Sequence, residues 1–541
     1  MFSTYLKGKI KKKKASRGES QEKQDLQPFK EKKLFEDLKR NIETVKTELG
    51  HSNDIVIREF RVGGNIQAAA LFTDGLSDQV TLSDFVIKGL MHLQDEALSL
   101  EQNIGPEKIM QIVKEQLITF GDVQEVSDWE QLFKRMLSGS SILLFDGCDK
   151  AISAATKGGE QRGVTEPSTQ TVIRGPREAF TESIRINTSL LRRIIKSPKL
   201  WLEERTIGEV TQTQVGIMYL KGIANEEIVQ EVRDRLDRIQ IDAILESGYI
   251  EELIQDEIWS PFPTVYNTER PDVTAGGLLE GRVAIIVDGT PFVLLVPVVL
   301  NSFLQSAEDY YQRFDLGSFL RLLRFASLFV ALLFPSLYVA ITTFHQEMLP
   351  TSLMLHLSAQ REGVPFPPII EALLMEIVFE VLREAGVRMP SAVGNTISIV
   401  GALVIGQAAV EAGIVAPAMV IVVSFTAIAN FVIPAISLAI AVRLLRFGLL
   451  ILSGTLGMFG VAVGLLVLVL HLASIRSFGI PYLSPFAPFM RNQQRDALFR
   501  FPQWAMDTRP PFISDDEDLV RQGNNQKPEK PQGDQSRHDG E

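Results

Sequence analysis

The polar residues with the clearest potential for chemistry in this 541-residue chain lie inside apolar stretches of its C-terminal half. The stretch 394–417 is long and apolar enough to cross a membrane, yet it contains Asn395, Thr396, Gln407 and Glu411. Because amides and carboxylates are costly in hydrocarbon, such residues are expected to face protein or water. The stretch therefore predicts either helix packing through polar contacts or a path for a polar solute.

On a helix with about 100° per residue, the polar and the small residues of this stretch fall on opposite sides. The first side consists of Thr396, Val400, Leu403, Gln407 and Glu411. The second side holds residues that allow close helix–helix approach in lipid, namely Gly394, Ser398, Gly401, Ala402, Ala408, Ala409 and Ala412. Two interpretations remain open. The polar residues either bond to neighbouring helices or headgroups, or they line a pore in which valine and leucine form a dry constriction.

A second set of ionisable residues lies in the apolar stretch 368–387, which contains four glutamates. Glu376, Glu380 and Glu384 follow one another at intervals of four residues, so they share a helix face on which like charges repel. They need water, arginine partners or cations. In a cyclic oligomer they would form an acidic vestibule that concentrates cations. The alternative is a helix at the membrane surface with its glutamates in solvent.

Other classes of chemistry find no support in the sequence. The chain has no phosphate-binding loop, nucleophile elbow or zinc-protease motif, so we expect no enzyme and no cofactor. The single cysteine, Cys148, excludes an intramolecular disulfide and a cysteine-cluster metal site. The formal net charge of −11 argues against a general nucleic-acid binder. The N-terminus has basic residues but no apolar core of a secretory signal, so we expect the soluble half to be cytoplasmic.

The elements that must position these residues form a soluble part and a membrane part. We predict an α/β cytosolic N-terminal domain with two subdomains, followed by an all-α multi-span membrane domain. The predicted ranges are a basic disordered tail 1–33, α/β subdomains 34–157 and 158–280, a hairpin and linker 281–317, a helical membrane domain 318–488, and a polar disordered tail 489–541.

Within the soluble part, periodicity predicts helices at 34–50 and 225–239, the latter with Asn225 as its N-cap. Strands are predicted at 54–62, 66–74, 140–147 and 213–222, and 171–195 is predicted to start as a strand and continue as a helix. The sequence Asp288-Gly289 between two apolar runs predicts a β-hairpin over 281–297 rather than a membrane span.

Four strong membrane spans are predicted, with an acidic fifth candidate whose crossing would decide the side of the C-terminus. The strong spans are 318–344, 391–413, 417–442 and 447–473, and the fifth is 368–387. Arginines at several ends give no single orientation by the positive-inside rule. The number of spans therefore stays open.

Several segments together resemble the A-type subunit of the GerA family of spore-germination nutrient receptors. They are "RGPREAFTESIRINTSLLRR" (174–193), "TERPD" (268–272), "EGRVAIIVDGTPF" (280–292), "EDYYQRF" (308–314) and the two apolar stretches 363–390 and 394–417. The resemblance covers residues 34–488. It departs from the expected pattern at Gln170 and Ala179, where glutamate and glycine are expected, and in the long polar tail.

The resemblance implies a role and partners. Family members work with a multi-span, transporter-like B subunit that holds the germinant and with a lipoprotein C subunit, in the spore inner membrane. The A subunit is expected to form a ring, a pentamer, that conducts ions. By this resemblance Thr396, Val400, Leu403, Gln407 and Glu411 line the channel, with the glutamate stripe at its vestibule. The alternatives are a non-conducting scaffold or relay subunit, and a soluble domain that itself binds a ligand.

Overall fold

The computed structural model describes residues 32–62, 66–91, 110–111, 113–114, 123–158, 166–167, 170–388, 404–506 and 508–514. The chain forms two compact units: Met1–Val164 with Ser183–Glu204, and Thr165–Glu182 with Arg205–Glu541. The basic tail predicted at 1–33 and the last part of the polar tail, from residue 515, lie almost entirely outside the described residues.

The first unit is an antiparallel sheet covered by helices. Its strands have the order β1-β2-β4-β5-β3. They are β1 (Ile55–Val62), β2 (Ile66–Thr73), β3 (Val123–Val126), β4 (Ser141–Phe145) and β5 (Ala151–Ala154). The helices are α2 (Leu38–Glu48), the π-helical η1 (Thr81–Ile87), α3 (Lys88–Met91), α5 (Trp129–Met136) and α6 (Ile184–Ile194). The predicted helix at 34–50 and the strands at 54–62, 66–74 and 140–147 are confirmed to within a few residues.

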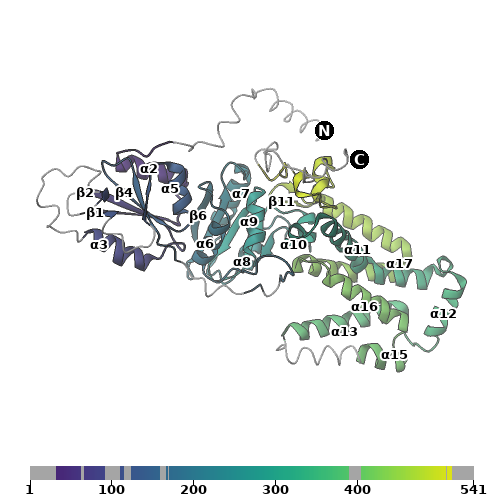
Figure 1. Cartoon of the computed structure of the whole chain (residues 1–541). Coiled ribbons are helices and arrows are strands. Elements are labelled where there is room, and N and C mark those ends of the chain that lie inside the picture. The colour runs from purple at the N-terminus through teal and green to yellow at the C-terminus, as the bar shows by residue number, and fades with distance from the viewer. Residues whose placement is uncertain are drawn as a thin grey trace, which may run out of the picture. The chain divides into compact units, whose positions relative to one another are not determined.

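Alternation along the strands places this sheet between two apolar cores. Successive strand residues point to opposite faces. Leu71 and Leu144 therefore pack with α2 and α5, whereas Ala70 and Leu143 pack with residues of η1 and α3. Figure 1 shows these helices around the purple strands. The predicted α/β class is confirmed for this part of the chain.

The second sheet has the same strand path as the first, in the order β6-β7-β9-β10-β8. Its strands are β6 (Leu200–Ile207), β7 (Thr213–Leu220), β8 (Tyr266–Thr268), β9 (Val283–Val287) and β10 (Val293–Val296). Its helices are α7 (Glu226–Asp237), α8 (Ser247–Ile254) and α9 (Pro271–Leu279). In both sheets a hairpin of two eight-residue strands comes first, the third strand along the chain pairs with the fifth, and a helix precedes the last hairpin. The α/β part is thus a duplicated topology, which the sequence analysis did not detect.

The Asp288-Gly289 hairpin is confirmed. Strands β9 and β10 pair antiparallel with Val283 opposite Val296, and Gly289 has a φ of 91°, which the turn requires and which few other residues adopt. The hairpin is part of the second sheet, with β7 on one side and β8 on the other, rather than a separate linker. Burial of both strands explains an apolar run that resembles a membrane span.

Two details of the soluble part differ from the sequence prediction. The segment from Thr171 does not begin as a strand; it is irregular until α6 starts at Ile184. A turn at Gly175-Pro176 interrupts it, and proline cannot donate a ladder hydrogen bond. By contrast, Asn225 is confirmed as the N-cap of α7, because its side chain accepts the N–H of Glu227.

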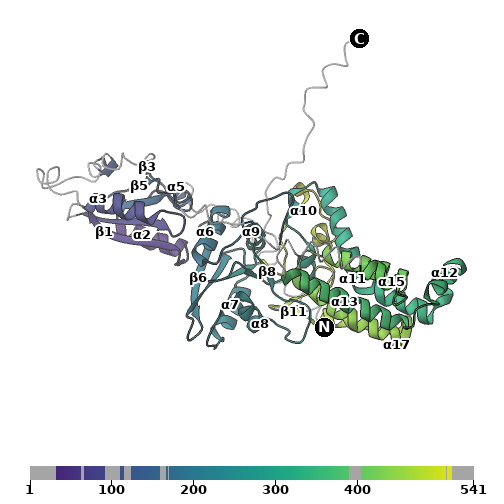
Figure 2. The ribbon, with the colours of Figure 1, turned by 90° about the horizontal axis from the view of Figure 1, so that it is seen from below.

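The C-terminal half is helical. Its helices are α10 (Glu308–Tyr311), α11 (Phe314–Phe344), α12 (Thr351–Arg361), α13 (Pro368–Arg388), α15 (Ala409–Glu411), α16 (Pro417–Phe431) and α17 (Ile436–Ser474), with the 3₁₀ turn η3 (Leu300–Leu304) before them. Helices α11, α13, α16 and α17 pack against one another (Figures 1 and 2). Two of the described helices, α11 and α17, are long and apolar enough to cross a membrane, and α16 is shorter. Helix α17 consists of two helical segments joined by a kink at Gly457, whose φ of 61° and ψ of −141° are not helical.

The helix break predicted at 443–446 is wrong. The structure has the break at 432–435, and α17 then continues through Arg443 and Arg446. Pro434 explains the position, because proline has no N–H to continue a helix. The arginines do not end a helix because both are buried in the bundle beside glutamates.

Residues 489–506 and 508–514, which were predicted as the start of a disordered tail, are structured. We call residues 475–514 the C-terminal segment; it contains β11 (Arg476–Ser477), β12 (Ile480–Pro481) and the 3₁₀ turns η6 (Arg491–Asp496) and η7 (Gln503–Ala505). The Ser477 hydroxyl donates to the carbonyl of Thr264 at 2.7 Å, and Ala224 forms a β-bridge with Ser514. These contacts attach the segment to the second sheet and its loops.

Candidate functional site

Only part of the predicted pore helix lies within the described residues. Gln407 belongs to the π-helical turn η5 (Val404–Ala408) and donates from Nε2 to Oε1 of Glu411 at 2.8 Å; both side chains are exposed. Ala409 packs against the apolar core of the bundle, and Ala412 is exposed. The remaining predicted residues lie outside the described part: Thr396, Val400 and Leu403 of the polar face, and Gly394, Ser398, Gly401 and Ala402 of the small-residue face.

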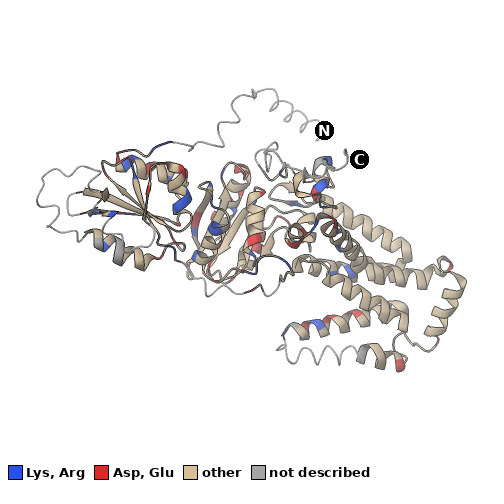
Figure 3. Ribbon diagram, in the orientation of Figure 1, with Lys and Arg blue, Asp and Glu red and all other residues tan. Residues whose placement is uncertain are grey.

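The glutamate stripe of α13 is paired with arginines. A carboxylate oxygen of Glu376 lies 2.5 Å from Arg446, and both side chains are almost fully buried. Glu380 accepts from Arg443 at 3.0 Å and from Arg383 at 2.6 Å. Charges of both signs along α13 are visible in Figure 3. Water, arginine partners or cations could each have compensated the repulsion between neighbouring glutamates. For Glu376 and Glu380 the structure shows arginine partners.

The ends of the stripe differ in exposure. Glu384 pairs with Arg388 at 2.6 Å, and both side chains are exposed on the surface of the bundle. At the other end Glu371 is buried, accepts the backbone N–H of Ala416 at 3.1 Å and lies 3.4 Å from Arg361. Ala416 is the N-cap of α16, where a carboxylate is favoured by the helix dipole. This glutamate therefore connects α12, α13 and α16.

A buried ion-pair cluster lies where α11 begins, and the sequence analysis did not predict it. The Asp309 carboxylate accepts from Nε of Arg321 at 3.0 Å and from Nη1 of Arg324 at 2.7 Å. Arg321 also donates to the Asp496 carboxylate at 2.9 Å and to the Asp496 carbonyl at 2.7 Å. The cluster thus holds α10, α11 and the C-terminal segment together. Its signal was the acidic pair in "EDYYQRF" followed by two arginines three residues apart.

A second cluster joins three of the family-like motifs. Arg270 of "TERPD" donates to Asp272 at 2.7 Å and to the carbonyl of Pro176 in "RGPRE" at 3.2 Å. The hydroxyl of Tyr311 in "EDYYQRF" donates to Asp272 at 2.6 Å. Burial, and then this contact with the carboxylate, raise the pKa of Tyr311 above its usual range. These hydrogen bonds hold the three motifs together, so the residues that form them have a structural role.

The position that departs from the expected pattern, Gln170, borders this cluster. Its side-chain oxygen accepts from the hydroxyl of Thr268 at 2.7 Å, and its carbonyl accepts from Arg270 at 3.1 Å. A glutamate could accept the same hydroxyl proton, so the substitution preserves the contact. Within the described ranges, no group of three or more His, Cys, Asp or Glu side chains could hold a metal ion.

Comparison with known sequences identifies the chain's relatives. The family model described as Bacillus/Clostridium GerA spore germination protein matches residues 43–512. The chain belongs to the GerA family. The resemblance drawn from its motifs is thereby confirmed. This GerA-family protein is 51% identical over 494 residues to spore germination protein KA of Bacillus subtilis strain 168, covering 91% of this chain and 89% of that protein.

Two further relatives are similar. The uncharacterized membrane protein YfkQ of Bacillus subtilis strain 168 is 43% identical over 487 residues, covering 90% of this chain and 93% of YfkQ. Among solved structures, the N-terminal domain of the A subunit of the Bacillus megaterium spore germinant receptor GerK3 is 42% identical, with a TM-score of 0.41. That match covers 50% of this chain and 98% of the solved chain. Family and relatives support a germinant receptor A subunit.

Proposed function

We propose that this GerA-family protein is the A subunit of a spore germinant receptor and assembles into a membrane channel. The channel opens and releases ions when a nutrient binds the partner B subunit, a multi-span, transporter-like protein; a lipoprotein C subunit completes the complex. The observation that carries the proposal is the exposed Gln407–Glu411 pair in an otherwise apolar helical region. In a membrane, an exposed amide and carboxylate require water or a polar partner.

The membrane location is supported by the outer surface of the bundle. In the apolar window of α17 only 22% of residues are buried. Large apolar side chains on this helix, including Phe459 and Leu466, are exposed. A soluble protein rarely exposes so much contiguous apolar surface, whereas lipid covers it without cost. We place the protein in the spore inner membrane, with its α/β part on the cytoplasmic side.

A ring of copies supplies the water that the polar pair needs. If the helix 394–413 faces a shared axis, Thr396, Gln407 and Glu411 line the wet ends of the lumen, and Val400 and Leu403 form a dry gate between them. Glu384 and its neighbours on α13 contribute to a vestibule, which the arginine pairs would hold close to neutral. A pentamer is the ring size that the family resemblance suggests.

Opening follows from linkage between nutrient and ring. A nutrient bound to the B subunit shifts the closed–open equilibrium only to the extent that it binds better to the open complex. The buried cluster of Asp309, Arg321 and Asp496 connects α11 to the C-terminal segment. A movement of α11 is therefore transmitted to the cytoplasmic part without a flexible link.

The test uses matched leucine-to-alanine substitutions. Leu403→Ala at the proposed gate should make spores leak cations and germinate without nutrient, because a smaller side chain no longer excludes water. Leu466→Ala, on the exposed surface of α17, should leave dormancy unchanged. Normal dormancy and normal nutrient response in Leu403→Ala and in Val400→Ala would reject this face as the pore.

The second candidate is a non-conducting scaffold or relay subunit. It is favoured by the same buried ion-pair cluster, which would transmit movement equally well in a protein without a pore. Reconstitution of the purified chain alone in liposomes separates the two functions. Rings with a measurable ion conductance support the channel, whereas a chain that carries no current under any tested potential supports the relay.

A further inference from the structure

The turn at residues 257–260 presents two large apolar side chains at the surface of the second unit. The N–H of Ser260 donates to the carbonyl of Glu257 at 3.4 Å, which places Ile258 and Trp259 at the tip of the turn. These two residues, which we call the apolar tip, are 71% and 95% exposed. Isolated apolar residues are common on protein surfaces, but a fully exposed tryptophan beside an exposed isoleucine is unfavourable in water. The apolar tip therefore suits a surface that is covered in the assembled protein.

Contacts on both sides of the apolar tip fix its position. Before it, the carboxylate of Asp256 accepts the N–H of Phe478 in the C-terminal segment at 2.7 Å. After it, the hydroxyl of Ser260 forms a hydrogen bond of 2.9 Å with Nε2 of His471, and the ring of Phe262 lies 6.2 Å from the same imidazole, centroid to centroid. The apolar tip is thus held at the end of α17 and not on a freely moving loop.

The apolar tip adjoins the exposed apolar surface of α17. His471 lies in the last turn of this helix, which ends at Ser474. Val467 precedes His471 by four residues, so the two share a helix face and are separated by about 6 Å along the axis. Val467 is exposed, as is Leu470. The turn is therefore bonded to α17 where the apolar outer surface of the helix comes to its end.

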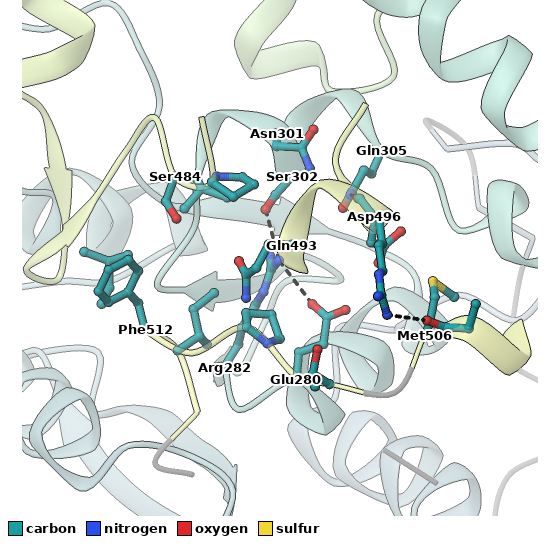
Figure 4. Close-up of a pocket in the computed structure, with 18 residues that line it drawn as sticks. Glu280, Arg282, Asn301, Ser302, Gln305, Ser484, Gln493, Asp496, Met506 and Phe512 are labelled. Carbon is teal, nitrogen blue, oxygen red and sulfur yellow. Dashed lines mark hydrogen bonds and ion pairs between the residues drawn. The ribbon is translucent and has the colours of Figure 1, made fainter. Parts of the chain in front are cut away.

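The residues around this end of α17 are typical of a membrane boundary. Arg476 is exposed and follows the helix, where an arginine marks the cytoplasmic end of a span. Tryptophan is enriched at the same level, because its ring is apolar and its N–H can reach water or a headgroup. The chain then returns to the second sheet, where Ser484 and Gln493 line a pocket with Arg282 (Figure 4). The end of α17 and the second sheet thus lie on the same side of the proposed membrane.

We propose that the apolar tip inserts into the lipid headgroup boundary of the cytoplasmic leaflet, beside α17. Its occupant is lipid because the apolar tip continues a helix surface that lipid already covers. The insertion rests on the membrane placement in the proposed function, but it does not require that the protein conducts ions. The chain leaves the turn through Phe262 into β8. A lipid contact at the apolar tip therefore restrains the second sheet against the membrane independently of the helices.

Fluorescence of the full chain in liposomes with brominated acyl chains tests the insertion. The chain has four tryptophans, so the signal of Trp259 is the difference between the wild type and Trp259→Phe, which keeps the apolar tip. Bromines near the headgroups should quench Trp259 more strongly than bromines at the ends of the acyl chains. This preferential quenching should be lost in Trp259→Phe.

Two reference positions are measured in the Trp259→Phe protein. Leu466→Trp lies on the exposed surface of α17, about 7.5 Å along the helix axis from His471, and should be quenched more by bromines at the chain ends. Val210→Trp lies in the exposed turn between β6 and β7, and β6 is the edge strand opposite β8. It should be quenched by acrylamide in water and by neither lipid.

The references separate failure of the insertion from failure of the membrane placement. If bromines quench Leu466→Trp but not Trp259, the insertion is wrong and the channel proposal stands. In that case quenching of Trp259 by acrylamide shows that the apolar tip faces water, and protection from both quenchers shows that a second copy or another protein covers it. If Leu466→Trp is not quenched either, α17 does not span the bilayer and both proposals fall.

Discussion

Replacing Arg321 tests whether the buried cluster holds the C-terminal segment to α11. The Arg321 guanidinium is fully buried and contacts Asp309 at 3.0 Å and Asp496 at 2.9 Å. Arg321→Met keeps the apolar part of the side chain and removes its charge and donors. The Asp496 side chain, which is 29% exposed, can recover water, whereas Asp309 is fully buried and keeps Arg324 and the backbone N–H of Ser306 as its partners.

The expected cost follows from these contacts. Removing one partner of a buried ion pair typically costs about 3–5 kcal/mol. Because Arg324 still compensates Asp309, we expect the lower end, about 3 kcal/mol. A free-energy change of this size increases the population of the opened state about a hundredfold. The opening should be local, since the lost contacts join only α10, α11 and the C-terminal segment.

Hydrogen exchange of the purified chain measures this opening directly. The N–H of Phe501 donates to the carbonyl of Arg495 at 2.9 Å, and its exchange should accelerate about a hundredfold in Arg321→Met. The ladder between β2 and β4, where Leu71 is opposite Ile142, should be unaffected. The matched control is Arg313→Met, an exposed arginine at the start of the same helix. If the exchange rate of the Phe501 N–H is unchanged, or if exchange in the first sheet accelerates equally, the ion pairs of Arg321 do not act locally to hold the C-terminal segment to α11.

Three further predictions concern the α/β part. Gly50→Ala should lower the melting temperature more than Gly222→Ala, because both glycines have positive φ (61° and 82°) but only at Gly50 would a Cβ collide with a neighbour, the ring of Trp201 at 2.0 Å. Burial raises the pKa of Glu251, so the protonated folded form is favoured and stability falls as pH rises through that pKa; Glu251→Gln should therefore melt above the wild type at neutral pH, and the gap in melting temperature should close in acid. Burial also raises the pKa of the Cys148 thiol from 9.0 to about 11; since this lowers the thiolate fraction about a hundredfold, iodoacetamide should label the native protein at least that much more slowly than the urea-unfolded chain.

The sequence predicted those elements whose signals are local. Alternation located β1 and β2, β4 was predicted as a short buried strand that ends in a turn, and β7 was also predicted as a strand. Asp288-Gly289 located a hairpin inside a run that hydropathy alone assigns to a membrane. The duplicated topology was not predicted from the sequence because it is a property of strand order, which residue types do not reveal. One local trace of it exists: the last hairpin of each sheet turns through an Asp-Gly pair, at Asp146-Gly147 in the first and Asp288-Gly289 in the second.

The sites were harder to predict because their partners are distant in sequence. Arg321 has one carboxylate partner nearby, Asp309, but the other, Asp496, lies 175 positions later, in a region whose composition suggested disorder. Arg282 and Gln493 likewise line one pocket only because the C-terminal segment folds back onto the second sheet. For Glu376, spacing correctly indicated that a partner was required, but it could not choose arginine over water or cations.

Buried pairing also explains why the positive-inside rule gave no single orientation. The rule counts arginines that remain in water beside a span. Arg321, Arg324, Arg443 and Arg446 are each at most 9% exposed and contact carboxylates within the same bundle. Once paired, such arginines are nearly neutral units of the helix packing and do not mark a cytoplasmic loop. When the buried arginines are not counted, the distribution of arginines along the chain no longer requires a helix end near Arg443. This agrees with the structure, in which α17 continues through Arg443 and Arg446.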